Sequence, residues 1–184
     1  LPRRMWAGSR LEFRRPITIG VDIVRESRID DVTVKQGKSG ALVFVRVRHE
    51  IGDGAGVAVV DEHDIVYRDA PKAGDTPPAA QMAPSDAQWK RRIAADDVLL
   101  FRYSALTFNG HRIHYDRRYA TEVEGYPGLV VHGPLLATLL LDLLRRNLPA
   151  ATVARFAFRA MKPTFDTEPF TVCGCAGAEG STVR

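Results

Sequence analysis

Residues 133–148, GPLLATLLLDLLRRNL, contain the one long apolar helix pattern of the 184-residue sequence. Leucines recur there with the i, i+1, i+4, i+5 spacing of a helix that is apolar over most of its surface. Gly133 lies at the start of this pattern, and Arg145 and Arg146 lie in its last turn, where cations favour the helix dipole. The pattern predicts a helix buried against a sheet.

Before this helix, residues 11–67 have the pattern of an antiparallel meander. Alternation is clearest around residues 43–48, and a Gly-rich loop at 52–56 indicates a hairpin. One sheet face is therefore expected to be buried and the other solvated. The predicted strands are residues 17–24, 29–34, 41–48 and 57–67, with turns at Gly20 and at 37–40.

A proline-rich stretch, residues 70–88, separates these strands from a second unit and predicts a linker or long surface loop. In the second unit, residues 98–104, 153–161 and 170–175 have strand-like patterns on either side of the long helix. One buried helix with antiparallel strands predicts an α+β fold. The first unit lacks a helix of its own and the second lacks about two strands, so we expect chain to be missing at both ends.

Composition narrows the class of protein. Hydrophobic residues make up 45% of the chain, charged residues 26%, and the net charge is +4 at pH 7. Scattered arginines do not favour nucleic acid, no stretch suits a membrane span, and a mild positive field suits an anionic small ligand. Cys173 and Cys175, two residues apart, suit neither a disulfide nor a four-ligand zinc site, and they fit one face of a strand in a reducing cytoplasm.

The most polar motif is residues 104–116, SALTFNGHRIHYD, and a third histidine follows at His132. A cluster of this kind, facing the start of a helix, suits proton transfer next to a polarising helix terminus. The alternative is metal binding by His111, His114 and His132, but no Glu or Cys completes a ligand set. Asp116 is expected to cap the short segment 117–121.

Residues 105–116 resemble the MaoC-like family of hot dog fold hydratases and dehydratases, whose motif reads roughly A-x-S-G-D-x-N-P-I-H-x-D. Residues 126–133, YPGLVVHG, and the first unit, residues 31–40 and 62–68, are similar to one branch. That branch holds mesaconyl-CoA and itaconyl-CoA hydratases and mitochondrial-type 3-hydroxyacyl-thioester dehydratases. The resemblance implies a double hot dog, in which antiparallel sheets wrap long helices. Its expected parts are an incomplete N-terminal unit (1–70), a linker (71–96) and a C-terminal MaoC-like unit (97–184).

The resemblance also implies a reaction and its residues. Water would add reversibly to a 2-enoyl thioester, without a cofactor. His114 falls on the family's catalytic histidine and Asn109 on its catalytic aspartate. Because an amide cannot exchange a proton as a carboxylate does, Asn109 would orient water or only shape its loop. Gly133, at the helix start, would donate its N–H to the thioester carbonyl, or would serve close packing.

Four further residues are predicted to bind substrate: Arg112, Tyr126, Val131 and His132. Arg112 would meet a carboxylate or a CoA phosphate, or would be an ordinary exposed arginine. The expected substrate is a short dicarboxylic acyl-CoA such as mesaconyl-CoA or itaconyl-CoA. The alternatives are a fatty-acid-synthesis dehydratase acting on an acyl-carrier-protein thioester and a non-catalytic acyl-CoA-binding module. Open sheet edges suggest a homodimer.

Overall fold

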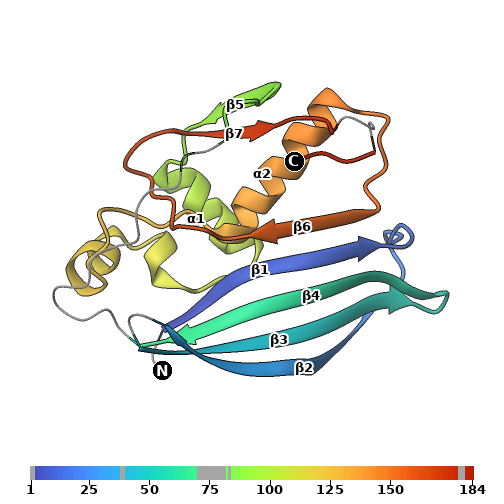
Figure 1. Ribbon diagram of the computed structural model, residues 1–184, viewed down its shortest axis with the longest axis horizontal. Helices are drawn as coiled ribbons and strands as arrows, with labels where there is room; N and C mark the ends of the chain where they lie inside the picture. The colour runs from blue at the N-terminus through green and yellow to red at the C-terminus, as the bar shows by residue number, and fades with distance from the viewer. Residues whose placement is uncertain (1–2, 38–39, 70–81, 83, 178–180) are drawn as a thin grey trace. The chain divides into compact units, whose positions relative to one another are not determined.

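The computed structural model describes residues 3–37, 40–69, 82, 84–177 and 181–184 (Figure 1). Contacts divide the chain into two units. The first unit comprises residues 1–80 and 152–161, and the second comprises residues 81–151 and 162–184. Residues 38–39 of the predicted turn at 37–40, and residues 70–81 and 83 of the proline-rich stretch 70–88, lie outside the described residues.

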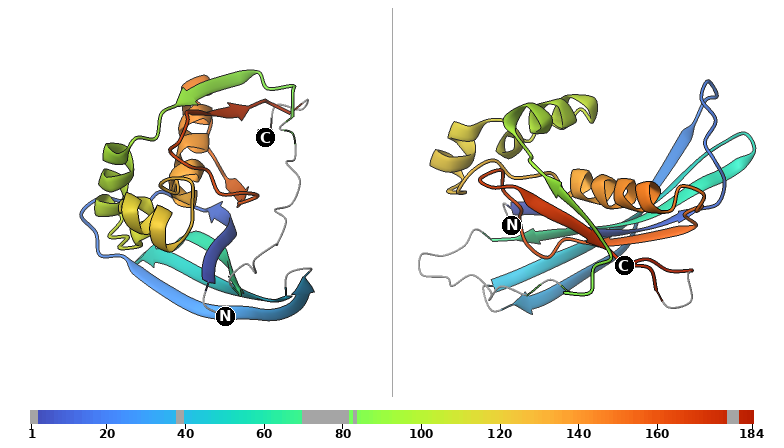
Figure 2. Two further views of the ribbon diagram at one scale, coloured as in Figure 1. Left: turned by 90° about the vertical axis from the view of Figure 1, so that its left-hand side faces the viewer. Right: turned by 90° about the horizontal axis from the view of Figure 1, so that it is seen from above.

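The first unit is a five-stranded antiparallel sheet in the order β2-β3-β4-β1-β6. Its strands are β1 (Arg3–Phe13), β2 (Val24–Gly37), β3 (Gly40–Asp53), β4 (Gly56–Arg68) and β6 (Arg155–Arg159). The four N-terminal strands are long and form a curved, twisted layer (Figure 2). The prediction of antiparallel strands is thus confirmed, and the hairpin loop between residues 53 and 56 joins β3 to β4.

The two faces of this sheet differ in chemistry, but the predicted contrast between a buried and a solvated face is not seen along β3, whose residues are all half-buried. Residues paired directly across an antiparallel ladder share one face. On one face, Asp64 accepts hydrogen bonds from Arg10 Nη1 (2.8 Å) and Arg46 Nε (3.0 Å), and Glu62 accepts one from Arg10 Nε (2.9 Å). The other face is largely aliphatic along β3. Exposed ion pairs of this kind contribute little individually to stability.

The predicted strand at residues 17–24 is wrong except for Val24, which begins β2. Residues 14–23 form no strand, Ile19 is fully exposed, and Gly20 has φ +91°. A positive φ suits glycine in a turn and breaks an extended run. β1 instead begins at Arg3, upstream of the predicted strands.

The second unit contains the long helix that the leucine pattern predicted, α2 (Gly133–Asn147). It packs against a two-stranded antiparallel sheet of β5 (Trp89–Ile93) and β7 (Phe170–Gly174). Ile93, Leu143 and Val172 form one buried cluster between them. β5 falls inside the segment predicted as linker, and β6, from the predicted C-terminal unit, pairs with β1 in the first sheet.

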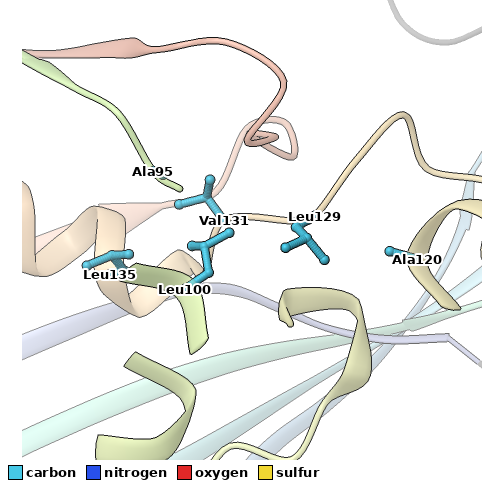
Figure 3. Close-up of a cluster of buried hydrophobic side chains, with 6 residues drawn as sticks. All are labelled: Ala95, Leu100, Ala120, Leu129, Val131 and Leu135. Carbon is cyan, nitrogen blue, oxygen red and sulfur yellow. The ribbon is translucent and has the colours of Figure 1, made fainter. Parts of the chain in front are cut away.

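The predicted strand at residues 98–104 is also wrong, because this segment is the helix α1 (Asp97–Leu106). Asp96 caps it by accepting a hydrogen bond from the Leu99 N–H at 2.8 Å. Its two buried residues, Leu100 and Ser104, are four apart, which is helical spacing. Leu100 belongs to the main core of the unit, shown in Figure 3. The core residues are Ala95, Leu100, Ala120, Leu129, Val131 and Leu135.

α1 ends in a Schellman motif. The Asn109 N–H bonds to the Ser104 carbonyl at 2.9 Å and the Phe108 N–H to the Ala105 carbonyl at 3.3 Å. Phe108 holds the left-handed position of this motif, with φ 51°, where glycine is usual. Two short helical turns follow, η1 (Arg112–His114) and the π-helical η2 (Tyr119–Val123).

Two remaining predictions concern the whole chain. Among the described residues, no helix is both long and apolar enough to cross a membrane. Cys173 and Cys175 are both free thiols, in and directly after β7.

Candidate active site

Three of the four buried polar side chains among the described residues, Ser104, His114 and His132, belong to the predicted motifs. They come from α1, from η1 and from the residue before α2. Burying polar groups is costly unless they are hydrogen-bonded. Three buried polar side chains in one place therefore indicate that they bond to one another or that they have a functional role. One hydrogen bond, between Ser104 and His132, and one ring contact, between His132 and His114, join the three side chains.

His114 is 8% exposed, and its Nδ1 lies 2.6 Å from the backbone carbonyl of Val130. A carbonyl can only accept, so Nδ1 carries the hydrogen and Nε2 presents a lone pair in the neutral ring. Burial lowers the pKa of His114, and the charge of His111 lowers it further, while the bond to Val130 opposes them. His114 is therefore a neutral imidazole with a free basic nitrogen near neutral pH.

His132 lies against His114, with ring centroids 3.8 Å apart and planes within 17°. Its Nε2 shares a 2.8 Å hydrogen bond with the hydroxyl of Ser104, and Tyr103 contacts the ring edge. Burial, followed by the charges of His114 and His111, lowers the pKa of His132 to about 3. His132 thus stays neutral and supports the His114 ring without titrating near neutral pH. Its buried Nδ1 has no hydrogen-bond partner.

Asn109 is half-buried, and its Oδ1 accepts a hydrogen bond from the His111 N–H at 3.1 Å. The His111 carbonyl in turn accepts from the His114 N–H at 3.2 Å. The amide therefore shapes the loop that leads into η1, as one of the two sequence interpretations held. The side-chain NH₂ of Asn109 remains a donor that a water or substrate oxygen can use.

The start of α2 supplies backbone N–H donors beside the stacked rings of His114 and His132. His132 is the N-cap, with φ −61° and ψ 131°, and its carbonyl accepts from the Leu136 N–H. The earlier N–H groups of a helix, here including Gly133, have no acceptor within the helix. Together with the helix dipole they favour negative charge close to Gly133, the first residue of α2.

Arg112 is exposed and bonds to Asp116 through Nη2 at 2.7 Å, with its guanidinium over the Tyr119 ring. Asp116 also accepts from the Tyr119 N–H at 3.0 Å, so the predicted cap is confirmed. The hydrogen bond from the Tyr119 N–H, followed by the ion pair with Arg112, lowers the pKa of Asp116. Arg112 would have to leave this pair, or share it, to bind a substrate anion.

The two other predicted substrate-binding residues take different places. Val131 is 3% exposed and belongs to the core (Figure 3). Its N–H donates to the Thr164 carbonyl at 2.8 Å. Tyr126 is half-buried and lies against the ring of Phe165, at 5.8 Å between centroids. Val131 therefore contributes packing, and Tyr126 is the more accessible of the two.

The sequence prediction missed Ser104 and the Val130 carbonyl as partners of the two histidines. The buried i, i+4 pair of Leu100 and Ser104 was the available signal, had the segment been read as a helix. His111, His114 and His132 do not bring three ligand atoms within 4.8 Å of one another in the described part of the chain. The stacked, buried His114 and His132 rings are an arrangement that suits proton transfer.

Comparisons with known proteins agree with the geometry. The chain is 47% identical over 169 residues to the mesaconyl-C(4)-CoA hydratase of Chloroflexus aurantiacus, a match that covers 92% of this chain and 60% of that protein. This chain thus spans about 60% of its relative's length.

Two solved structures share the fold. A MaoC-like dehydratase from Phytophthora capsici matches with a TM-score of 0.72 at 17% identity, over 98% of this chain and 65% of the other. A Mycobacterium tuberculosis protein described as a double hot dog fold matches with a TM-score of 0.56 at 18% identity, over 92% of this chain and 61% of the other. These likenesses show an α+β double hot dog fold. The model of the hydroxyacyl-thioester dehydratase type 2 family matches residues 1–166, and the chain belongs to that family.

Proposed function

We propose that the chain carries the active site of a hydro-lyase that adds water reversibly to a 2-enoyl-CoA thioester. The observation that carries the proposal is the buried His114, whose Nδ1–H is held by the Val130 carbonyl and whose Nε2 is free to act as a base. The family and the 47% identity to a hydratase support the same reaction class.

In the proposed hydration, His114 Nε2 takes a proton from water as the water oxygen bonds to C3 of the enoyl group. The C2–C3 double bond opens and negative charge moves onto the thioester oxygen. Gly133 N–H and the positive end of α2 stabilise that enolate oxygen. The enolate collapses as C2 takes the proton back from His114, so the enzyme ends in its starting state. Asn109 would orient the water through its free NH₂ group.

We propose a short dicarboxylic acyl-CoA, such as mesaconyl-CoA or itaconyl-CoA, as the substrate. The name of the Chloroflexus aurantiacus relative and its 47% identity support this choice. A net charge of +4 is also compatible with an anionic substrate. Arg112, exposed and basic, is the side chain we expect to meet the carboxylate or a CoA phosphate.

The test compares hydration rates of wild type and His114→Ala on mesaconyl-CoA and crotonyl-CoA, with a crotonyl carrier-protein thioester as a third substrate. Loss of one general base should lower kcat by about 10²- to 10⁴-fold. Equal rates in both proteins would remove His114 from the mechanism. No turnover of any substrate by folded wild type would favour a binding module, and preference for the carrier-protein thioester would favour a fatty-acid dehydratase.

A second substitution, Asn109→Asp, examines the amide. An aspartate can keep the hydrogen bond from the His111 N–H, so the loop should persist. We expect activity to be retained or to rise, since the variant restores the carboxylate of the family motif. A large loss in a folded variant would show that the NH₂ group has its own role.

We further propose that the protein is a cytoplasmic homodimer. The free thiols of Cys173 and Cys175 support a reducing compartment. Light scattering of the purified chain at several concentrations measures its assembly, and a monomer at all of them would contradict the dimer.

A further inference from the structure

The second histidine cluster of the described residues lies in the other unit, on the N-terminal sheet. His49 is on β3, and Asp61 and His63 are on β4. In the ladder His49 pairs with Asp61, and Val47 pairs with His63. Directly opposed residues share a face, and so do residues two apart on one strand, so all three side chains lie on the largely aliphatic face.

The three side chains are close enough to share an ion. One potential ligand atom from each lies within 4.8 Å of the other two, and His63 Nδ1 is 3.7 Å from Asp61 Oδ2. Nitrogen and oxygen ligands of one tetrahedral Zn²⁺ are roughly 3.4 Å apart, given bond lengths of about 2.0–2.2 Å. Small side-chain rotations on two adjacent, rigidly paired strands would close the remaining difference.

Asp61 supplies an independent reason to expect a bound cation. Its Oδ1 is buried and has no hydrogen-bond partner, although the side chain as a whole is 19% exposed. An unsatisfied buried carboxylate oxygen is costly, and a bound cation would satisfy it. The positive charge of Arg25, on β2, lies close enough to His49 to disfavour a bound cation. The carboxylate of Asp61 would contact the ion directly, however, whereas Arg25 would not.

Neighbouring groups orient the two rings. Ser27 Oγ lies 2.7 Å from His49 Nδ1, which leaves Nε2 of His49 for a metal ion. The His63 ring stacks on Trp6 at 5.7 Å between centroids, and Trp6 stacks in turn on Phe158 at 5.1 Å. A hydrogen bond at the second ring nitrogen, as His49 has with Ser27, is typical of metal-binding histidines.

We propose that His49, Asp61 and His63 bind a divalent transition-metal ion, with Zn²⁺ as the best match, and leave at least one position for water. Two imidazoles and a carboxylate suit Zn²⁺ and its transition-metal neighbours, whereas Mg²⁺ and Ca²⁺ prefer oxygen ligands. The site goes beyond the proposed hydration, which uses His114 and needs no metal.

The experiment titrates the chelator-treated 184-residue chain with Zn²⁺ by calorimetry and with Co²⁺ by visible absorption. We expect one ion per chain and no comparable binding of Mg²⁺. Asp61→Asn and His63→Gln should each weaken Zn²⁺ binding by more than about 100-fold, beyond the cost of losing an outer-shell partner. Ser27→Ala should weaken it by about 10-fold.

Two matched controls should leave the affinity unchanged. Glu62 lies between Asp61 and His63 in the sequence, but its side chain is on the opposite face of β4. Glu62→Gln therefore makes the same carboxyl-to-amide change as Asp61→Asn, away from the proposed site. His111→Ala removes an exposed histidine of the other unit. Circular dichroism of each variant verifies folding, so that loss of binding in both ligand variants is a loss of ligands.

Three outcomes would overturn the proposal: no stoichiometric binding, equal binding by Asp61→Asn and wild type, or loss of binding in His114→Ala with both cluster variants unaffected. The last would assign the ion to the other histidines. Hydration rates with and without chelator, measured in parallel, keep the metal site separate from the proposed enzymatic function, since we expect them to be equal.

Discussion

At the scale of single residues, two stacked histidines have different chemistry because their surroundings differ. His132 is 1% exposed and bonded to Ser104, and its pKa falls to about 3. His114 keeps a backbone acceptor on one nitrogen and has a free lone pair on the other. Two protonated rings 3.8 Å apart would repel each other, so the neutral His132 allows His114 alone to take up a proton.

The backbone conformation of Phe108 leads to a testable prediction. It is 97% exposed and adopts φ 51° at the end of α1, where the related family motif has glycine. Non-glycine residues in the left-handed region are disfavoured by about 1 kcal/mol. Phe108→Gly should therefore raise the thermal midpoint by about 2–4 °C for a chain of this size.

The measurement is thermal unfolding followed by circular dichroism, with Phe108→Ala as the control that removes the ring but keeps a Cβ. A gain in the glycine variant that the alanine variant lacks would assign the effect to the backbone. A lower midpoint in Phe108→Gly would contradict the strain argument.

The sequence identified part of this site at the residue scale and not the rest. His114, Asn109 and Gly133 lie in contiguous motifs, so a family pattern reveals them. The Val130 carbonyl and the Ser104 hydroxyl reach the histidines only through folding, across 16 and 28 residues. A backbone carbonyl carries no side-chain signal, so its role could not be predicted.

At the scale of elements, the two helices of the second unit show when hydrophobic periodicity is enough to predict a helix. α2 repeats its leucines over four turns, and its predicted bounds agree with Gly133–Asn147 within one residue. α1 is only ten residues long, with an apolar run at its start that also fits a strand. A short apolar run does not separate the two states, and the Asp96 cap was the signal that could have done so.

The start of α2 gives a prediction about backbone chemistry. Gly133→Pro removes one N–H group, and proline is tolerated in the first turn of a helix. The preceding His132, at ψ 131°, has a conformation that a following proline accepts. If Gly133 N–H stabilises the enolate oxygen, kcat should fall by about 10²- to 10³-fold while the thermal midpoint changes little.

Gly133→Ala is the matched control, because it adds a Cβ and keeps the N–H. Steady-state hydration kinetics should place this variant near wild type. Equal losses in the proline and alanine variants would assign the effect to bulk and remove the backbone donor from the mechanism.

At the scale of the whole molecule, the buried histidines predict acid sensitivity. His132 has a pKa of about 3 when folded and an ordinary value of about 6.5 when unfolded. Below pH 6.5 the unfolded chain binds a proton that the folded chain does not, so the free energy of unfolding decreases from about pH 6.5 toward pH 3. The lowered pKa of His114 acts in the same direction.

Urea unfolding at a series of pH values measures this dependence, with His132→Gln as a variant that cannot titrate at that position. We expect the wild-type free energy of unfolding to fall more steeply with acid than that of the variant, by an amount on the order of a few kcal/mol. Parallel slopes for the two proteins would contradict the assigned burial.

The fold class could be predicted from the sequence, but the assignment of strands to the two units could not. Antiparallel strands and one long helix were readable from local patterns. The pairing of β6 with β1 joins residues about 150 apart, and β5, at residues 89–93, pairs with the distant β7, at residues 170–174. Long-range pairing depends on tertiary packing, which no local pattern contains.

The central claim is that Nε2 of His114 is the base, and the pH dependence of kcat/KM for mesaconyl-CoA hydration tests it most directly. Because burial lowers the pKa of His114, wild type should lose activity only below about pH 6.5, along an acid limb of unit slope. His114→Ala should have a rate lower by about 10²- to 10⁴-fold and lack that limb. An acid limb of unchanged position and slope in His114→Ala would contradict the account.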